Sequence, residues 1–182
     1  MSTIDASRTT QVLVRYGTIP QVERTTSLIA EEVPRGARVV IRTDRGEELG
    51  ELLQPITAGQ QSSEEEANGT VLLRVATEQE IQQSLELRRN CEEEYPLWQK
   101  RIADWGLELE LIDLERNLDD SLLILYVLND RGPDCTKLAL RVAAEGLGNV
   151  KVQPVGAEGP VAVTAAVGTG SCSSGGSCGC RS

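Results

Sequence analysis

The sequence has no histidine, no phenylalanine and only one methionine among its 182 residues. Histidine is the commonest general base and a common zinc ligand, so its absence excludes histidine-dependent triads and histidine metal sites. The core must be built from leucine, valine, isoleucine and alanine, because two tryptophans and three tyrosines are the only aromatic residues. Acid–base chemistry would therefore fall to carboxylates, lysine, tyrosine or cysteine.

Basic residues are also scarce, since 18 lysines and arginines face 28 acidic residues and give a net charge of −10. A chain this acidic is repelled by phosphate backbones unless its basic residues cluster. Residues 1–46 carry seven arginines against five acidic residues, whereas residues 47–68 carry six glutamates and no base. If the chain binds RNA, we expect the contacts to come from the N-terminal arginines, which include Arg15, Arg24, Arg35, Arg38, Arg42 and Arg45.

The sequence contains no long apolar run. The opening MSTIDASRTT has neither an apolar core nor a cleavage pattern, which predicts that it is not a signal peptide. No apolar run reaches transmembrane length. We therefore expect a cytoplasmic protein whose five cysteines remain reduced and form no disulfide framework.

The N-terminal part has the alternation and turn residues of short strands. Residues 11–16 predict a strand, and residues 38–43 and 47–53 predict a hairpin with a glycine-containing turn. Residues 17–37 contain two glycines and two prolines, so we expect a loop there with one short strand near residues 26–30.

The C-terminal half predicts a longer sequence of elements. A strand at residues 70–76 leads into a capping box at residues 77–80 and a helix that ends near Gly106. Apolar residues including Leu85 follow one face of that helix, and Pro96 predicts a kink or break. Two strands, a helix and a last strand follow, at residues 107–116, 121–129, 134–145 and 150–155.

This order, βαββαβ, predicts a ferredoxin-like unit in an α+β protein. We divide the chain into an N-terminal β region (1–56), an acidic linker (57–69), the ferredoxin-like unit (70–158) and a flexible Gly/Ser/Cys-rich tail (159–182). Many functions use this fold, so the fold alone identifies none of them.

The tail carries the only candidate metal chemistry. Cys172, Cys178 and Cys180 lie in GTGSCSSGGSCGCRS, where three thiolates on a pliable segment could converge on a soft metal or an iron–sulfur cluster. The alternative is an unstructured tail that binds metal only adventitiously. A fourth ligand could be Cys91 or Cys135, although core packing explains both residues better.

Four segments together resemble one family. They are residues 44–50 (DRGEELG), 74–80 (RVATEQE), 106–115 (GLELELIDLE) and the start of the second helix at residues 131–138. Over residues 11–158 their order and content resemble the PSP-one C-terminal domain family, the bacterial YaaT/RicT family.

The resemblance implies a non-catalytic, cytoplasmic regulatory protein that acts within a complex. The bacterial member works with two small helical regulatory subunits and assists RNA maturation by ribonuclease Y, and that complex carries iron–sulfur clusters. By resemblance, the tail cysteines lie in the region where the family ligates a cluster.

Two other functions stay open from the residues alone. A direct RNA-binding module would use Arg15, Arg38, Arg42 and Arg45, with only Tyr126 available on the predicted strands for base stacking. An enzyme could hold a hard cation on clustered carboxylates, although an alternating strand and an acidic turn explain these residues more simply. The carboxylates are Asp113, Glu115, Asp119 and Asp120.

Overall fold

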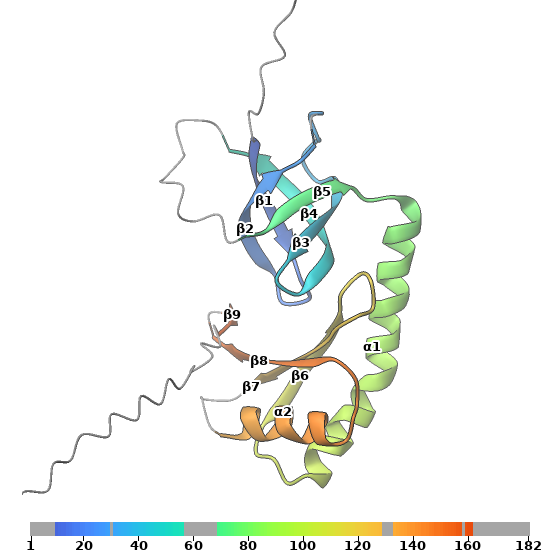
Figure 1. Cartoon of the computed structure of the whole chain (residues 1–182), viewed down its shortest axis with the longest axis vertical. Helices are drawn as coiled ribbons and strands as arrows, with labels where there is room; N and C mark the ends of the chain where they lie inside the picture. Colours follow the sequence, from blue (N-terminus) through green and yellow to red (C-terminus); the bar gives the residue numbers. More distant parts are fainter. Residues whose placement is uncertain (1–9, 30, 57–68, 129–132, 158, 162–182) are drawn as a thin grey trace, which may run out of the picture.

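A computed structural model describes residues 10–29, 31–56, 69–128, 133–157 and 159–161. Within these ranges it contains two helices and two sheets, which confirms the predicted α+β class. One sheet closes into a barrel and the other is open, with four strands. In Figure 1 the barrel lies above the open sheet, and the long helix α1 runs beside both.

Five strands form the N-terminal barrel, in the order β1-β2-β5-β3-β4 with β4 closing onto β1. They are β1 (Thr10–Tyr16), β2 (Gln21–Ser27), β3 (Arg38–Thr43), β4 (Gly46–Pro55) and β5 (Val71–Val75). Neighbouring strands are antiparallel except β2 and β5, which are parallel. The closed ladder leaves no long free edge, and one apolar cluster fills the interior.

The barrel contains two hairpins, β1–β2 and β3–β4, and the sequence predicted only the second correctly. The predicted hairpin at residues 38–43 and 47–53 is confirmed as β3 and β4, joined by a two-residue turn. The prediction of a loop over residues 17–37 with a short strand near 26–30 is wrong. The polar sequence QVERTTS of β2 gives a weak apolar signal, and pairing along the whole length of β1 fixes it as a strand.

Helix α1 (Glu78–Asp104) begins with the predicted capping box. The Thr77 hydroxyl accepts a hydrogen bond from the Glu80 amide, and the Glu80 carboxylate accepts one from the Thr77 amide. The helix continues through Pro96 as one element, because the packing of Trp98 beyond it outweighs the lost backbone bond. Leu85, which we placed on the apolar face, is 59% exposed.

The second sheet has the order β6-β7-β8-β9. Its strands are β6 (Glu110–Arg116), β7 (Leu123–Leu128), β8 (Val150–Gly156) and β9 (Gly159–Pro160). Strands β7 and β8 are parallel neighbours, and α2 (Asp134–Ala144) makes the crossover between them. The helix at residues 134–145 and the strand at 150–155 are thus confirmed.

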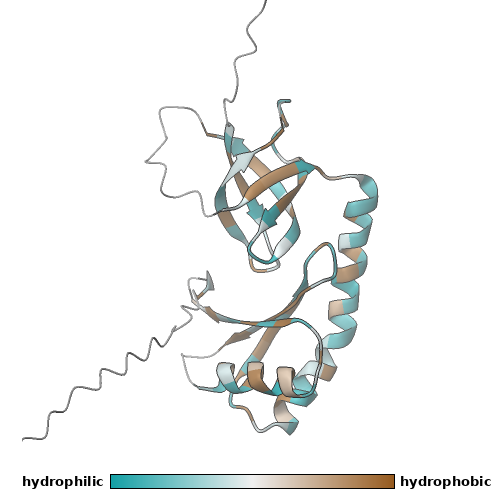
Figure 2. Cartoon of the chain, in the orientation of Figure 1, coloured by the Kyte–Doolittle hydropathy of each residue, from teal (hydrophilic) through white to brown (hydrophobic). Residues whose placement is uncertain are grey.

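The central strand β7 has buried side chains on both faces. Figure 2 shows hydrophobic colouring in the strands of this sheet. Leu123, Leu125 and Val127 pack against both helices in a second apolar cluster, separate from that of the barrel. Ile124 and Tyr126 alternate with them and lie on the face toward the barrel, where both are fully buried. The barrel therefore covers part of the sheet face that the helices leave open.

The ferredoxin-like βαββαβ arrangement is not what forms. Strand β5, the expected first strand of that unit, belongs to the barrel, and β8 lies directly beside β7. The length of α1 explains the difference: 27 residues span about 40 Å. Strands of five to seven residues span about 17–23 Å. A helix so long begins well outside the sheet on which it ends.

Most of the predicted acidic linker and of the tail lie outside the described residues. The same is true of Cys172, Cys178 and Cys180. Among the helices that are described, none is both long and apolar enough to cross a membrane.

Candidate functional site

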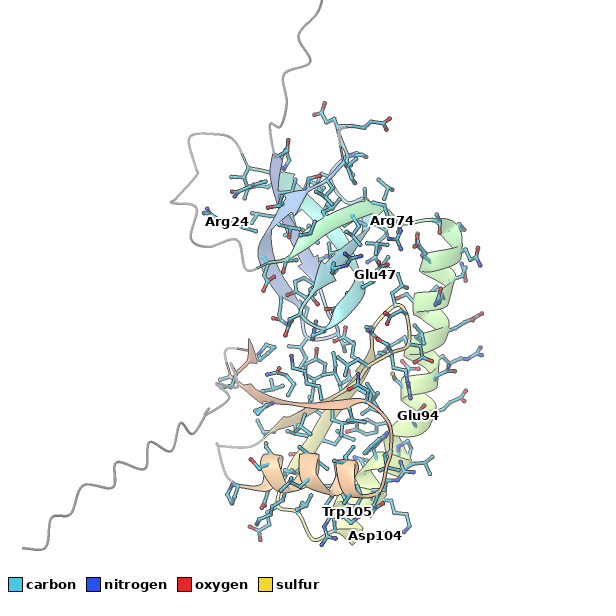
Figure 3. The ribbon with its side chains drawn as sticks, in the orientation of Figure 1. Arg24, Glu47, Arg74, Glu94, Asp104 and Trp105 are labelled. Atoms are coloured by element: carbon cyan, nitrogen blue, oxygen red, sulfur yellow. The ribbon has the colours of Figure 1, made fainter. Side chains whose placement is uncertain are left out.

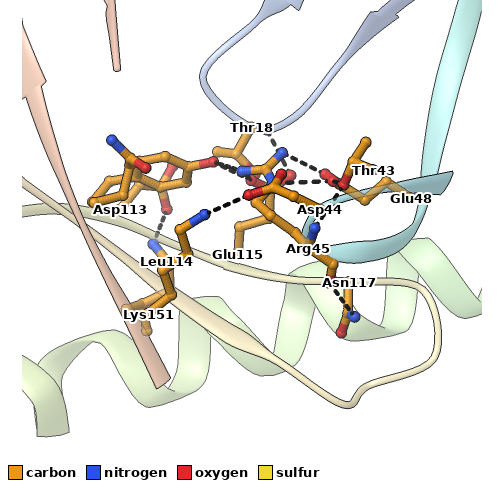
Figure 4. Close-up of polar contacts among 12 residues, drawn as sticks. Thr18, Thr43, Asp44, Arg45, Glu48, Asp113, Leu114, Glu115, Asn117 and Lys151 are labelled. Atoms are coloured by element: carbon orange, nitrogen blue, oxygen red, sulfur yellow. Dashed lines mark hydrogen bonds and ion pairs between the residues drawn. The ribbon is translucent and has the colours of Figure 1, made fainter. Parts of the chain in front are cut away.

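A buried network of charged groups and hydroxyls joins the barrel to the second sheet (Figure 4). Arg45, in the β3–β4 turn, donates from Nε and Nη2 to the two carboxylate oxygens of Glu48. Its Nη1 donates to the Tyr126 hydroxyl at 2.8 Å, and that hydroxyl donates to Glu115. The other oxygen of Glu115 accepts from the Thr18 amide at 2.8 Å.

Burial controls the electrostatics of this network. The side chains of Arg45 and Glu48 are 6% and 4% exposed. Burial raises the pKa of Glu48, although Arg45 opposes the rise. Burial, together with Glu115, also raises the pKa of Tyr126 far above its ordinary value, so this hydroxyl remains a donor. The groups satisfy one another, and the network acts as a clamp between the two sheets.

A second contact beside the clamp requires glycine. Gly46 has φ +115°, and a Cβ there would lie 2.6 Å from Nδ2 of Asn117. That nitrogen donates to the Arg45 carbonyl at 3.0 Å, and the Leu118 amide donates to the Glu47 carbonyl at 2.7 Å. The loop after β6 therefore docks directly on the backbone of the β3–β4 turn.

An exposed network ties the barrel to the start of α1 (Figure 3). Arg74 of β5 pairs with Glu47 at 2.7 Å and with Glu80 at 2.6 Å, and Arg42 approaches Glu47 at 3.4 Å. The hydrogen bond from Arg74 lowers the pKa of Glu47. The Thr77 amide and then Arg74 lower the pKa of Glu80. The capping box is thus linked to the barrel wall.

Three of the segments that carry the family resemblance meet at this joint. Residues 44–50 supply the turn with Arg45, residues 74–80 supply Arg74, and residues 106–115 end at Glu115. A family model described as the PSP1 C-terminal conserved region matches residues 70–145. We call residues 70–145 the PSP1 region. Comparisons with curated proteins and with solved structures find no match.

The PSP1 region does not coincide with either sheet. It begins at β5, which completes the barrel, and ends just after α2. The other four barrel strands precede it in sequence. The PSP1 region therefore supplies one strand of the barrel, and its Arg74 and Glu115 join networks that include Glu47 and Arg45 from the earlier part of the chain.

The four predicted arginine contacts occupy different environments. Arg45 is buried, so the prediction that it contacts RNA from the surface is wrong: its guanidinium is the centre of the clamp. Arg15 is exposed and pairs with Glu51 at 2.7 Å, while Arg42 pairs with Glu47. Arg38 is exposed.

A cavity of about 330 Å³ gathers arginines at the seam between the barrel, α1 and β6. Two of them, Arg15 and Arg38, are predicted contacts from the barrel, and the other two come from the PSP1 region. Those two are Arg88 of α1 and Arg116 of β6.

The internal cysteines and the clustered carboxylates already have structural roles. Burial raises the pKa of the Cys91 thiol to about 11, which fits its place in the core. Asp113 pairs with Arg88, and Asp120 pairs with Arg116. In the described part of the chain, no three cysteine or acidic side chains form a group that could hold a metal ion.

Sequence reasoning missed the members of the clamp that come from the interior. Tyr126 was considered for base stacking, but it is fully buried and its hydroxyl bridges Arg45 and Glu115. One signal was available, because a tyrosine in an apolar central strand needs a partner for its hydroxyl. Glu48 and Asn117 gave no local signal, since their burial comes from the docking of the two sheets.

Proposed function

We propose that the chain is a non-catalytic cytoplasmic adaptor that docks helical protein subunits in a complex linked to RNA maturation. The match of residues 70–145 to the PSP1 family model and the resemblance of the motifs support this role. The clamp supports it as well, because paired charges fix the barrel and the second sheet as one docking body.

The observation that carries the proposal is an apolar hollow on the helical layer. It has a volume of about 430 Å³ and lies between the end of α1 and the outer face of α2. Leu140 is 66% exposed at its edge, and Trp105 and Leu107 line it. Lys137 and Arg141 stand beside the apolar residues, so a partner helix with leucines flanked by acidic residues would fit.

Anaerobic pull-down from native extract tests the docking role. Leu140→Glu places a charge in the hollow and should abolish capture of small helical subunits. Ala139→Glu is the matched control, because Ala139 is exposed on the same helix but does not line the hollow. Equal capture by both variants, or no partner with the wild type, would reject the proposal.

We propose further that the tail thiolates of Cys172, Cys178 and Cys180 bind a soft metal or an iron–sulfur cluster. The wild-type chain reconstituted under anaerobic conditions should contain iron and acid-labile sulfide and absorb visible light. A variant with all three cysteines changed to serine should remain colourless. If the wild type is equally colourless, the tail does not hold a cluster.

Direct RNA binding is the second candidate, and the exposure of Arg15, Arg38 and Arg42 on the barrel favours it. Gel shifts with single-stranded RNA should then weaken steeply as salt rises. An absence of binding at low salt would eliminate this candidate.

A further inference from the structure

The arginine-lined cavity has the dimensions of a small-ligand site. Its volume of about 330 Å³ falls within the range of ligand pockets in proteins. Residues of β1, β3, β4, α1 and β6 line it, and so does the β1–β2 turn. It therefore exists only when the barrel and the PSP1 region are docked.

The barrel wall of the cavity carries an excess of positive charge. In the strand register Glu51 of β4 lies opposite both Arg15 of β1 and Arg38 of β3. The hydrogen bond from Arg15 lowers the pKa of Glu51, and the charges of Arg15 and Arg38 add to the effect. One carboxylate thus faces two guanidinium groups along this row.

The facing wall holds two more guanidinium groups in fixed positions. Arg88 donates from Nη1 to Asp113 at 3.0 Å and from Nε to Glu92 at 3.3 Å. Arg116 donates from Nη2 to Glu94 at 3.0 Å and from Nη1 to Asp120 at 2.8 Å. These carboxylates do not line the cavity. A guanidinium has five N–H donors, so each arginine has further donors for a ligand.

The rest of the lining is less polar. Leu49, Leu114 and Cys91 contribute apolar surface, and the raised pKa of Cys91, about 11, keeps its thiol uncharged. Ser84 of α1 adds a hydroxyl. Glu115 also lines the cavity. The lining therefore combines four guanidinium groups, two carboxylates and several apolar side chains.

We propose that this cavity binds a small organic phosphate monoester. Arginine presents paired donors that match phosphate oxygens, and four arginines from two walls can surround one dianion. The organic body would contact the apolar side chains of the lining. A long nucleic acid is a less suitable ligand, because its many phosphates would be repelled by a chain with a net charge of −10.

Calorimetric titration of the full chain tests the proposal with four probes: adenosine 5′-monophosphate, inorganic phosphate, adenosine and a short oligoribonucleotide. The monophosphate should bind more tightly than each of the other three. Arg38→Gln should weaken it about tenfold, and Ser84→Phe should weaken it by filling the cavity without removing charge.

Arg42→Gln is the matched control, because Arg42 lies on the same strand as Arg38 and outside the cavity. It should leave the affinity for the monophosphate unchanged, and thermal unfolding without ligand checks that each variant is folded. The proposal is overturned if adenosine or inorganic phosphate binds as tightly as the monophosphate, or if Arg42→Gln weakens binding as much as Arg38→Gln. Tighter binding of the oligoribonucleotide would also overturn it and make the cavity part of an RNA surface.

Discussion

Two arginines connect the barrel to the rest of the chain, and their surroundings differ sharply. Arg45 and Arg74 each lie near two carboxylates, Glu48 and Glu115 for the first, Glu47 and Glu80 for the second. The side chain of Arg45 is 6% exposed, whereas that of Arg74 is 44% exposed. Both arginines therefore form ion pairs with glutamates, but those of Arg45 are shielded from water and those of Arg74 are largely solvated.

This difference should determine what each pair does for the protein. In a buried pair each charge compensates the other, so removing one partner leaves an uncompensated charge in the interior. A solvated ion pair replaces contacts that each charge would otherwise make with water, so it adds little to the free energy of unfolding. We therefore expect the Arg45 clamp to control the docking of the two sheets, and the Arg74 network to make a small adjustment at the start of α1.

The largest effect is expected from Arg45→Met. The substitution leaves Glu48 buried without its cation and should lower the free energy of unfolding by about 3–5 kcal/mol in urea denaturation. Arg45→Met combined with Glu48→Leu should recover part of the loss. A single variant as stable as the wild type would show that the clamp does not hold the sheets together.

Gly46→Ala should have the next largest effect and lower the free energy of unfolding by about 1–3 kcal/mol. The new methyl would meet Asn117 at 2.6 Å and displace its bond to the Arg45 carbonyl. Gly36→Ala is the matched control, because Gly36 lies in the loop before β3, also has positive φ and has nothing within 4 Å of an added Cβ. Equal losses in the two variants would mean that backbone strain alone accounts for the effect.

Arg74→Gln should lower the free energy of unfolding in urea denaturation by much less, about 0.2–1 kcal/mol. The loss should shrink further in high salt, since the pair is solvated. A cost comparable to that of Arg45→Met would contradict the comparison between the two networks.

The smallest effect is a difference in pH dependence. The pKa of Glu80 is lowered from 4.5 in the folded chain, so its contribution to stability is present above pH 4.5 and is lost as pH falls below it. The pKa of Glu48 is raised from 4.5, so its contribution falls as pH rises above that value. Urea denaturation across this pH range gives the difference in free energy of unfolding between each variant and the wild type. This difference should change with pH in opposite directions for Glu80→Gln and Glu48→Gln.

Much of the fold could be predicted where the local pattern is strong. The β3–β4 hairpin, the capping box of α1 and the helix that begins at Asp134 all have signals within a few residues. Strand β2 could not be predicted, because its polar sequence gives a weak apolar signal and pairing with β1 fixes it as a strand. The position of β5 could not be predicted, because its partners β2 and β3 are distant in sequence. The partners of Arg45 were missed for the same reason, since Tyr126 lies 81 residues away.

Local sequence patterns were sufficient to predict the α+β class, the elements with strong signals and the resemblance to the PSP1 family. Long-range packing places β5 in the barrel, buries Arg45 and brings four arginines to one cavity. Propensity and capping act within one or two turns of chain, so they could not predict these features. Burial and charge pairing depend instead on which distant surfaces exclude water together.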